Sequence, residues 1–322
     1  MHAIVTAGDT LAWQQVPGPR LPGAGEVRVA VTATAVNRAD LMQRAGHYPP
    51  PPGASDILGL ECAGVIDAIG PGVERWSVGD RVCALLAGGG YAEQVVVPEG
   101  HLLPVPDALD LTAAAALPEA LCTAWSNLRT VARLQPGETA LVHGGAGGVG
   151  TVALQVARRL GAAAVVTTAR GEQRSACESY GATHVVDYRD ADFVPVVHEL
   201  GGADVILDVQ GAGYLARNVD ALAVDGRLVV IAMQSGTRAE VNLAAMMAKR
   251  ATLFATTLRN RSSTFKGDLV EDLRPAWDEA SWDDASWLRP VVHAVLPISR
   301  AAEAHAIVAA GGHVGKVVLR VR

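Results

Sequence analysis

Apolar and polar residues alternate along much of the first third of the chain. The run Glu26–Val36 reads EVRVAVTATAV and predicts a strand with one polar face. Shorter strands are expected at Ala63–Ile69, Arg81–Leu86 and Tyr91–Val97, separated by turns that contain glycine or proline. Short alternating strands joined by such turns predict a mostly β, barrel-like domain.

Near residue 112 the pattern changes to helices and then to a regular alternation of strands and helices. Thr112–Ala116, with Thr112 as N-cap, and Glu119–Thr130 are expected to be helical. The alternating elements that follow are strands at Thr139–His143, Ala164–Thr168, Val205–Val209 and Arg227–Met233, and helices at Val149–Leu160, Gln173–Tyr180 and Tyr214–Leu222. This order predicts an α/β fold, with a doubly wound parallel sheet of the Rossmann type.

The end of the chain predicts a return to the first domain. A helix is expected at Arg300–Ala310 and a strand at Lys316–Val321, neither of which a Rossmann sheet needs. We therefore expect one domain at residues 1–118 and 259–322, and a nucleotide-binding domain at residues 119–258.

Composition narrows the class of protein. The 322 residues suffice for two domains, and the net charge of −6 without a basic block makes nucleic acid or an anionic membrane an unexpected partner. The sequence contains no apolar run long enough for a membrane span and no pattern of a signal peptide. The four cysteines lack CxxC spacing, so we expect buried, reduced thiols and a cytoplasmic protein.

The most informative segment joins the strand Thr139–His143 to the next helix. Gly145, Gly147 and Gly150 satisfy GxGxxG, and the loop is completed by Ala146, Gly148 and Val149. We expect Gly145 to permit the tight turn, Gly147 to let the backbone approach a pyrophosphate, and Gly150 to let the helix pack closely. The N–H groups at the start of the helix would then face the phosphates. A strand–turn–helix without a ligand is the simpler alternative.

The end of the second strand indicates which dinucleotide is bound. Enzymes that use NAD usually carry an acidic residue there, whereas this chain has Thr168 and Ala169 followed by Arg170 and, four residues later, Arg174. Guanidinium groups form charge-assisted, bidentate bonds with a 2′-phosphate, so NADPH is expected rather than NADH. Glu172 would pair with either arginine if these residues are structural.

Several segments resemble the medium-chain dehydrogenase/reductase superfamily, and within it the zinc-free quinone oxidoreductase branch. These segments are NRADLMQRAG from Asn37, YPPPPG from Tyr48, ILGLECAG from Ile57, VGDRV from Val78, GGGYAEQVVV from Gly88, LPEALCTA from Leu117 and VGKVVL from Val314. The glycine loop also resembles the signature of that branch but departs from it at Gly145, where the signature has Ala or Ser. The resemblance implies a GroES-like barrel domain beside the Rossmann domain.

The resemblance also implies that no zinc is bound. Zinc-dependent members carry a ligand Cys at the position of Asn37 and a ligand His at the position of Leu60, and the chain lacks their cysteine-rich structural lobe. Zinc requires three or four N, S or O ligands. The histidines and cysteines of this chain are scattered without HxH or CxxC spacing.

By resemblance, Asn37 and Tyr48 are the catalytic candidates near the nicotinamide. The residues alone favour simpler interpretations, with Asn37 as a turn residue and Tyr48 as a ring on a stiff proline loop. Thr123, Tyr188 and Lys316 match positions that contact the cofactor, although a helix-bonded hydroxyl for Thr123 and a surface position for Lys316 are equally reasonable. Further cofactor contacts are expected where two strands end, at Gln210, Gly211, Met233 and Gln234.

Three charged residues are expected to be structural. Asp80 and Arg81 belong to a Gly-Asp-Arg-Val turn, and Glu61 lies in an apolar stretch, so a buried partner is expected for it.

The expected activity is NADPH-dependent reduction of a quinone by hydride or electron transfer. Such a reaction needs proximity and orientation more than acid–base help, in agreement with a site without an evident nucleophile. One alternative is NADPH-dependent reduction of activated C=C bonds, as in alkenals or enoyl thioesters. A second is an NADPH-binding protein without turnover. A homodimer is expected by resemblance, through an edge strand at Ala251–Leu258.

Overall fold

The computed structural model describes residues 1–8, 10–283 and 285–322 and divides into two compact units. Unit 1 comprises Met1–Cys122 and Leu258–Arg322, and unit 2 comprises Thr123–Thr257. Among the described helices, none combines the length and the apolar character that a membrane crossing requires.

Unit 2 contains a six-stranded parallel sheet with the order β10-β9-β8-β11-β12-β13. Its strands are β8 (Thr139–His143), β9 (Ala164–Ala169), β10 (His184–Asp187), β11 (Ala203–Asp208), β12 (Leu222–Val230) and β13 (Thr252–Ala255). This is the 3-2-1-4-5-6 order of a Rossmann sheet, and the prediction is therefore confirmed. The central strands are mostly apolar, with β8 buried throughout and β11 buried except at Asp204, as a sheet covered on both faces requires.

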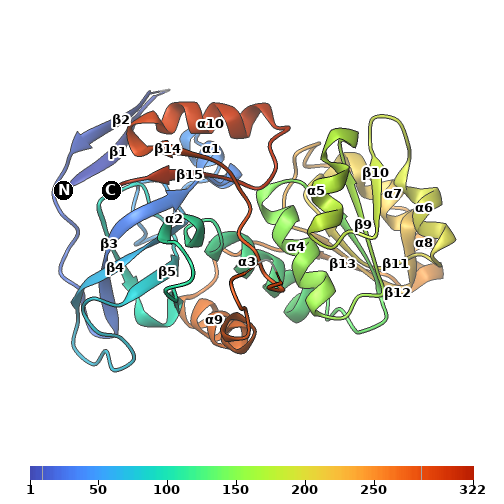
Figure 1. Ribbon diagram of the computed structural model, residues 1–322. Helices are drawn as coiled ribbons and strands as arrows, with labels where there is room; N and C mark the ends of the chain where they lie inside the picture. The colour runs from blue at the N-terminus through green and yellow to red at the C-terminus, as the bar shows by residue number, and fades with distance from the viewer. Residues whose placement is uncertain (9, 284) are drawn as a thin grey trace. The chain divides into compact units, whose positions relative to one another are not determined.

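Helices connect these strands on the two faces of the sheet (Figure 1). They are α4 (Gly148–Arg159), α5 (Arg174–Ser179), α6 (Phe193–Glu199), α7 (Leu215–Ala221) and α8 (Leu243–Lys249), with short turns η2 (Ser126–Val131), η3 (Gly171–Gln173) and η4 (Gly211–Tyr214). Helix α7 packs against both α6 and α8, which places these three on one face. The carboxyl ends of the strands, where ligands bind in such folds, are thereby left to the loops.

Unit 1 is built on a mostly antiparallel sheet with the order β14-β15-β3-β4-β5-β7, in which β6 also pairs with β3. Its strands are β3 (Glu26–Ala35), β4 (Glu61–Ile69), β5 (Arg81–Leu85), β6 (Gln94–Pro98), β7 (Leu102–Pro104), β14 (Val292–Pro297) and β15 (Lys316–Arg320), and β1 (His2–Ala7) and β2 (Thr10–Gln15) form a separate hairpin. The chain's last strand, β15, pairs with β3, so the end of the chain completes this sheet.

Helices and turns of unit 1 close the ends of this sheet (Figure 1). They are α1 (Arg38–Arg44), α2 (Leu111–Ala114), α9 (Ser263–Asp278) and α10 (Ala301–Ala310), together with η1 (Glu99–His101), η5 (Ile298–Arg300) and the first residues of α3 (Pro118–Trp125). Helix α10 packs on β15 and β14 through an apolar cluster that includes Val308, Val317 and Leu319. A second cluster lies between the strands and includes Val29, Ile66 and Val82.

Several predicted elements differ in detail from the structure. The N-cap of α2 is Asp110, whose carboxylate accepts the backbone N–H groups of Thr112 and Ala113, so the assignment of Thr112 was wrong. The expected helix Glu119–Thr130 changes from α3 to the wider η2 at Ser126. The expected strand at Tyr91 begins only at Gln94.

Candidate active site

The glycine-rich turn between β8 and α4 is built for close approach of backbone to ligand. Gly147 is the N-cap of α4, and the first N–H groups of that helix follow it. A Cβ on Gly150 would lie 2.1 Å from the carbonyl oxygen of Gly144, so a side chain there would push α4 off the turn. A Cβ on Gly147 would lie at 3.4 Å from the same oxygen, an ordinary contact. The glycine-rich turn therefore fits a pyrophosphate, because the absence of a side chain at Gly147 lets a ligand come close to the backbone N–H groups.

A glycine is required at position 145, but not because it makes the tight turn, as was predicted. Gly144 makes the tight turn, with a φ of +73°. Gly145 is needed because a Cβ there would lie 2.1 Å from Oγ1 of Thr167, whose hydroxyl donates to the carbonyl oxygen of Val142 at 2.6 Å. The buried threonine fills the space that a larger residue at 145 would take, which accounts for the departure from the family signature.

A buried histidine that sequence analysis missed supports this turn. His143, the last residue of β8, lies 2.7 Å from Oδ1 of Asn218 through Nε2 and 3.1 Å from the hydroxyl of Thr168 through Nδ1. The backbone N–H of Gly144 donates to the same hydroxyl at 3.3 Å. Burial lowers the pKa of His143 to about 4, which keeps the ring neutral at pH 7. Thr168 is 2% exposed, and its hydroxyl therefore serves the turn from within the protein.

Two of the residues predicted to contact the cofactor, Arg170 and Tyr188, meet at the carboxyl ends of β9 and β10. Nε of Arg170 lies 3.2 Å from the hydroxyl of Tyr188, which is 45% exposed. Arg174 lies one turn away, at the start of α5, and its guanidinium approaches Glu178 at 3.7 Å. This ion pair is loose and solvated, and it leaves the guanidinium able to bind another anion.

Glu172 pairs with Arg189, so its ion pair is not with Arg170 or Arg174, as the structural alternative for these arginines required. The two groups are 2.7 Å apart, and Arg189 also bonds Asp187 at 2.8 Å. Bonds from Arg189 and from the backbone N–H of Gly171 hold the pKa of Asp187 well below its usual range. Arg189 therefore fixes the loop that carries Arg170. Sequence analysis missed it, although its place directly after Tyr188 was a signal.

The loops after β11 and β12 are brought together as expected. The backbone N–H of Ser235 donates to the carbonyl oxygen of Gln210 at 2.8 Å, and Cα of Met233 would lie 2.9 Å from a Cβ on Gly211. Gln234 lies between Met233 and Ser235, and its N–H donates to the carbonyl oxygen of Val209. Strand β12 ends at Val230, so Met233 and Gln234 belong to the loop and not to the strand end that was predicted.

Asp208 orients the first of these loops and was not singled out by sequence. It is the last residue of β11, fully buried, and its carboxylate accepts the N–H groups of Gln210 at 2.6 Å and Gly211 at 3.0 Å. Burial raises its pKa to about 6, although these two bonds oppose the shift.

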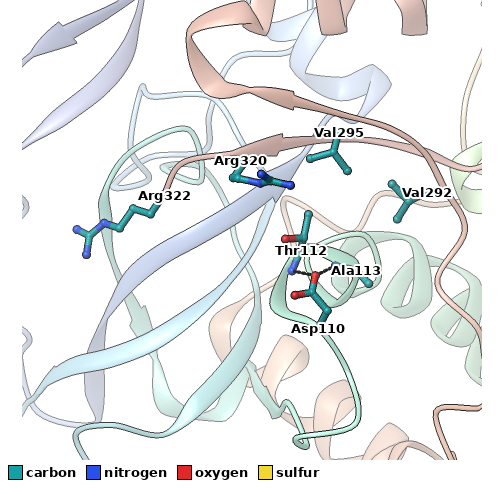
Figure 2. A pocket seen from close by; sticks show the side chains of 7 residues that line it. All are labelled: Asp110, Thr112, Ala113, Val292, Val295, Arg320 and Arg322. Atoms are coloured by element: carbon teal, nitrogen blue, oxygen red, sulfur yellow. Dashed lines mark hydrogen bonds between the residues drawn. The ribbon is translucent and has the colours of Figure 1, made fainter.

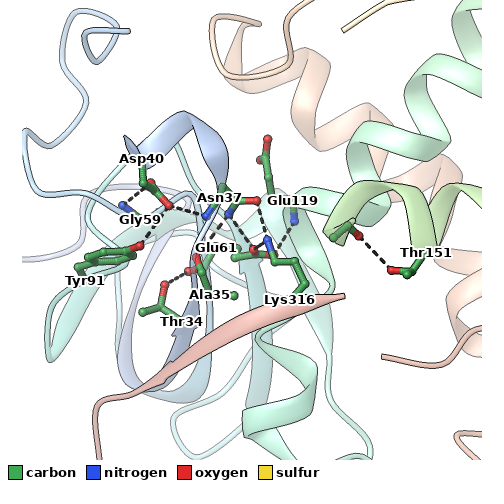
Figure 3. Close-up of polar contacts among 11 residues, drawn as sticks. Thr34, Ala35, Asn37, Asp40, Gly59, Glu61, Tyr91, Glu119, Thr151 and Lys316 are labelled. Carbon is green, nitrogen blue, oxygen red and sulfur yellow. Dashed lines mark hydrogen bonds and ion pairs between the residues drawn. The ribbon is translucent and has the colours of Figure 1, made fainter. Parts of the chain in front are cut away.

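Unit 1 contains a polar group that we call the Glu61 cluster: the buried residues Asn37, Glu61 and Lys316 and the partly buried Glu119 (Figure 3). Oε1 of Glu61 lies 2.6 Å from Nζ of Lys316 and accepts the side-chain amide of Asn37 at 2.8 Å, while Oε2 accepts the backbone N–H of Glu119 at 2.9 Å. Nζ of Lys316 also donates to Oδ1 of Asn37 at 2.6 Å. Glu61 is 0% exposed and Lys316 4% exposed, so the buried partner expected for Glu61 is confirmed and a surface position for Lys316 is wrong.

The Glu61 cluster continues into a second layer behind Asn37. The N–H of Asn37 donates to the buried carboxylate of Asp40, which also contacts the hydroxyl of Tyr91 at 3.3 Å. That hydroxyl lies 3.1 Å from Nε2 of His305 on α10. Burial raises the pKa of Asp40 to about 6 and lowers that of His305 to about 4. These contacts fix α1, and with it the side chain of Asn37.

Tyr48 lies on the proline loop after α1 and is partly buried. The guanidinium of Arg259 lies 5.3 Å from the centre of its ring and donates to its carbonyl oxygen at 3.1 Å. His47 beside it is exposed, in agreement with a solvated loop histidine. Asp80 and Arg81 hold turns, the former by accepting the N–H of Ser77, so their structural assignment is confirmed.

Thr123 lies in α3 and is 9% exposed, and its carbonyl oxygen accepts the side chain of Asn127 at 2.8 Å. It begins unit 2, whereas Tyr48, Asn37 and Lys316 belong to unit 1.

The described residues contain no group of three or more His, Cys, Asp or Glu side chains that could hold a metal ion. All four cysteines are free and buried, as expected. A cavity of about 540 Å³ lies in unit 1, and none of the predicted site residues lines it (Figure 2). Its lining is Asp110, Thr112, Ala113, Val292, Val295, Arg320 and Arg322.

The Rossmann strand order and the glycine turn are those of a dinucleotide-binding fold. Residues 148–274 match the family model of zinc-binding dehydrogenases, and residues 23–107 match that of the alcohol dehydrogenase GroES-like domain. The chain is 31% identical to the 2-haloacrylate reductase of a Burkholderia species over 97% of this chain and 95% of that protein. It is 29% identical to the quinone oxidoreductase of Rattus norvegicus, covering 94% and 91% of the two chains.

A mycobacterial protein solved in complex with NADPH has a TM-score of 0.85 and 32% identity over 99% of each chain. The chain also matches much longer proteins. It is 32% identical over 96% of its length to a mycocerosic acid synthase-like polyketide synthase of Mycobacterium tuberculosis, but spans 14% of that protein. It spans 58% of the human synaptic vesicle membrane protein VAT-1 homolog. The chain belongs to the medium-chain dehydrogenase/reductase superfamily, in its quinone oxidoreductase branch.

Proposed function

We propose that this protein is an NADPH:quinone oxidoreductase that transfers a hydride or electrons to a quinone without a bound metal. The observation that carries the proposal is Arg170 at the carboxyl end of β9, where an NAD enzyme would place an acid, with the hydroxyl of Tyr188 3.2 Å away. The similarity to the rat quinone oxidoreductase supports the choice of acceptor.

In this proposal the residues of unit 2 bind and orient the cofactor. The turn from Gly145 to Gly150, with Ala146, Gly147, Gly148 and Val149, would hold the pyrophosphate, and Arg170, Arg174 and Tyr188 the adenosine end. Thr168 would support the turn from behind. Gln210, Gly211, Met233, Gln234 and Thr123 would line the nicotinamide half. Bound NADPH supplies the hydride.

Unit 1 would supply the acceptor site through Tyr48 and Asn37. Asn37 would have to exchange its long bond to the carbonyl oxygen of Ala35, at 3.4 Å, for a substrate oxygen, because its other bonds belong to the Glu61 cluster. We take residues 1–118 and 259–322 as the catalytic domain and 119–258 as the cofactor domain.

The phosphate assignment predicts a change in cofactor preference. The double variant Arg170→Ala/Arg174→Ala should weaken NADPH binding roughly 100-fold or more, because each charge-assisted bond is worth about 1.5–3 kcal/mol, and should leave NADH nearly unchanged. Fluorescence titration with both nucleotides measures this, with exposed Arg238→Ala as the control. Equal losses for the two nucleotides would contradict a 2′-phosphate role.

Reduction of an activated C=C bond is the second candidate. Burial, followed by the charge of Glu61, raises the pKa of Glu119 to about 8, so this carboxyl is largely protonated at neutral pH and suited to donate a proton to carbon. The similarity to the 2-haloacrylate reductase supports it. Turnover of a naphthoquinone and of a 2-alkenal under NADPH oxidation separates the two activities. Binding of NADPH without consumption of either acceptor would instead favour a protein without turnover.

We propose a cytoplasmic homodimer that pairs through β13. Leu253 of this edge strand is 39% exposed, and Leu243 and Met247 of α8, the preceding helix in the chain, are 71% and 77% exposed. An unpaired apolar edge invites association. Sedimentation of wild type and of Leu253→Lys tests this, and a stable wild-type monomer would contradict it.

A further inference from the structure

Two cations are buried side by side in unit 1, outside the Glu61 cluster. Arg259 is 3% exposed and Lys266, on the first turns of α9, is 4% exposed. Nζ of Lys266 donates to the carbonyl oxygen of Arg259 at 2.7 Å. Buried charges are normally paired with an opposite charge, because desolvation of an unpaired ion costs several kcal/mol.

Among the described residues, the side chains of Arg259 and Lys266 donate hydrogen bonds to neutral acceptors. The guanidinium of Arg259 donates to the carbonyl oxygens of Ala87 at 2.9 Å and Tyr48 at 3.1 Å, and to Oε1 of Gln43 at 2.7 Å. A guanidinium has five N–H donors and an ammonium three. Within the described part of the chain, Arg259 uses three of its five donors and Lys266 one of its three. Two N–H donors therefore remain on each side chain.

The surrounding carboxylates do not cancel this charge. Within the described residues, neither cation has a carboxylate within ion-pair distance. Asp40 and Glu119 act on Arg259, and Glu119 acts on Lys266, but burial is the larger effect and lowers the pKa of both cations. Glu119 is itself largely protonated at neutral pH, as its pKa of about 8 requires. Lys266 in turn helps to lower the pKa of His101, as an uncompensated positive charge would.

We propose that Arg259 and Lys266 form a carboxylate-binding subsite beside Tyr48, for acceptors in which a carboxylate is conjugated with the bond to be reduced. This rests on the proposed reductase function and names its substrate class. A planar carboxylate matches the guanidinium fork, and a single negative charge suits two partly compensated cations. Gln43 and Tyr48, which accept hydrogen bonds from Arg259, are only partly buried, and an acceptor would approach Arg259 from their side.

The reaction leaves the carboxylate unchanged. For a 2-substituted acrylate, the C=C π bond breaks, a hydride from NADPH forms the bond to the β-carbon, and a proton completes the α-carbon. The acid becomes the 2-substituted propionate while NADPH is oxidised to NADP⁺. The charge that the subsite binds is therefore the same in substrate and product, so the subsite contributes binding and orientation.

The test compares an acid with its neutral analogue. 2-Chloroacrylate and 2-chloroacrylamide are supplied with NADPH to wild type, Lys266→Gln and the exposed control Arg261→Gln. Wild type should prefer the acid in kcat/KM. Lys266→Gln should reduce that preference roughly 10- to 100-fold, with the amide nearly unchanged, as loss of one charge-assisted bond implies. Arg261→Gln should alter neither substrate. Arg259→Lys, which keeps the charge but loses the fork, should give an intermediate preference.

Two results would overturn the subsite: no preference for the acid in wild type, or equal losses for acid and amide in Lys266→Gln. Menadione turnover is measured in parallel, so that a working quinone reductase without acid preference sinks the subsite alone, whereas loss of all NADPH oxidation sinks the reductase as well. If neither acrylate is reduced, 2-chloropropionate must inhibit menadione reduction more strongly than its amide, and less so in Lys266→Gln. Equal inhibition by the two would also overturn the proposal.

Discussion

The glycine turn of unit 2 and the Glu61 cluster of unit 1 are built in opposite ways. The turn spans seven consecutive residues, Gly144–Gly150, and functions by having almost no side chains. The cluster takes one residue from each of four segments, at positions 37, 61, 119 and 316, and functions through the side chains of Asn37, Glu61 and Lys316, which bond one another, and the backbone N–H of Glu119. A turn made by consecutive residues can be identified from the spacing of glycines in the sequence. A polar network between distant segments cannot be identified in this way.

The largest expected effect tests the Glu61 cluster. Lys316→Met removes the cation and leaves Glu61 buried without its partner, which should lower the free energy of unfolding by about 3–5 kcal/mol. Urea denaturation measures it. Adding Glu61→Gln should restore part of the loss, because the stranded charge is then gone. Equal stability of wild type and Lys316→Met would show that this ion pair is not the support of the cluster.

Two substitutions in the glycine turn should have different effects on stability and on NADPH binding. Gly150→Ala places a Cβ 2.1 Å from a backbone oxygen, so it should cost about 1–3 kcal/mol of stability and abolish tight binding of NADPH. Gly147→Ala meets only an ordinary contact of 3.4 Å and should remain stable while binding NADPH more weakly. Thermal unfolding and nucleotide titration of both variants check this. Equal thermal stability of the two would contradict the packing argument.

The smallest effect concerns pH and Glu119. Its pKa in the folded protein is about 8, above the ordinary value, so the folded state holds a proton that the unfolded state has released. The stability from this proton is complete below the ordinary pKa and is lost as the pH rises through about 8. Between pH 6 and pH 9 wild type should lose roughly 1–3 kcal/mol more than Glu119→Gln in urea denaturation. Glu61, Asp40, Lys266 and Lys316 remain in both proteins. Parallel pH curves for the two proteins would refute the assignment.

Prediction succeeded for elements with a strong local pattern. Strand β8 and the helix after it were placed within one residue, because an apolar strand, a glycine turn and an amphipathic helix are neighbours in sequence. It failed where a competing side chain decided the outcome. Asp110 rather than Thr112 is the N-cap of α2, and Glu172 forms its ion pair with Arg189 rather than with Arg170 or Arg174. The spacing of these residues in the sequence does not show which of two nearby side chains will form the bond.

What the sequence by itself determined is the alternation of strands and helices, the glycine turn, the basic residue in place of an acid at the end of β9, and the family. These properties are short in range and follow from backbone geometry and residue type. Only the tertiary structure decided that Lys316 is buried against Glu61, that Thr167 excludes a side chain at Gly145, and that Arg259 and Lys266 are buried next to each other with no ion pair among the described residues. These depend on which distant segments meet in a low-dielectric interior, where the energy of a charge is set by its neighbours.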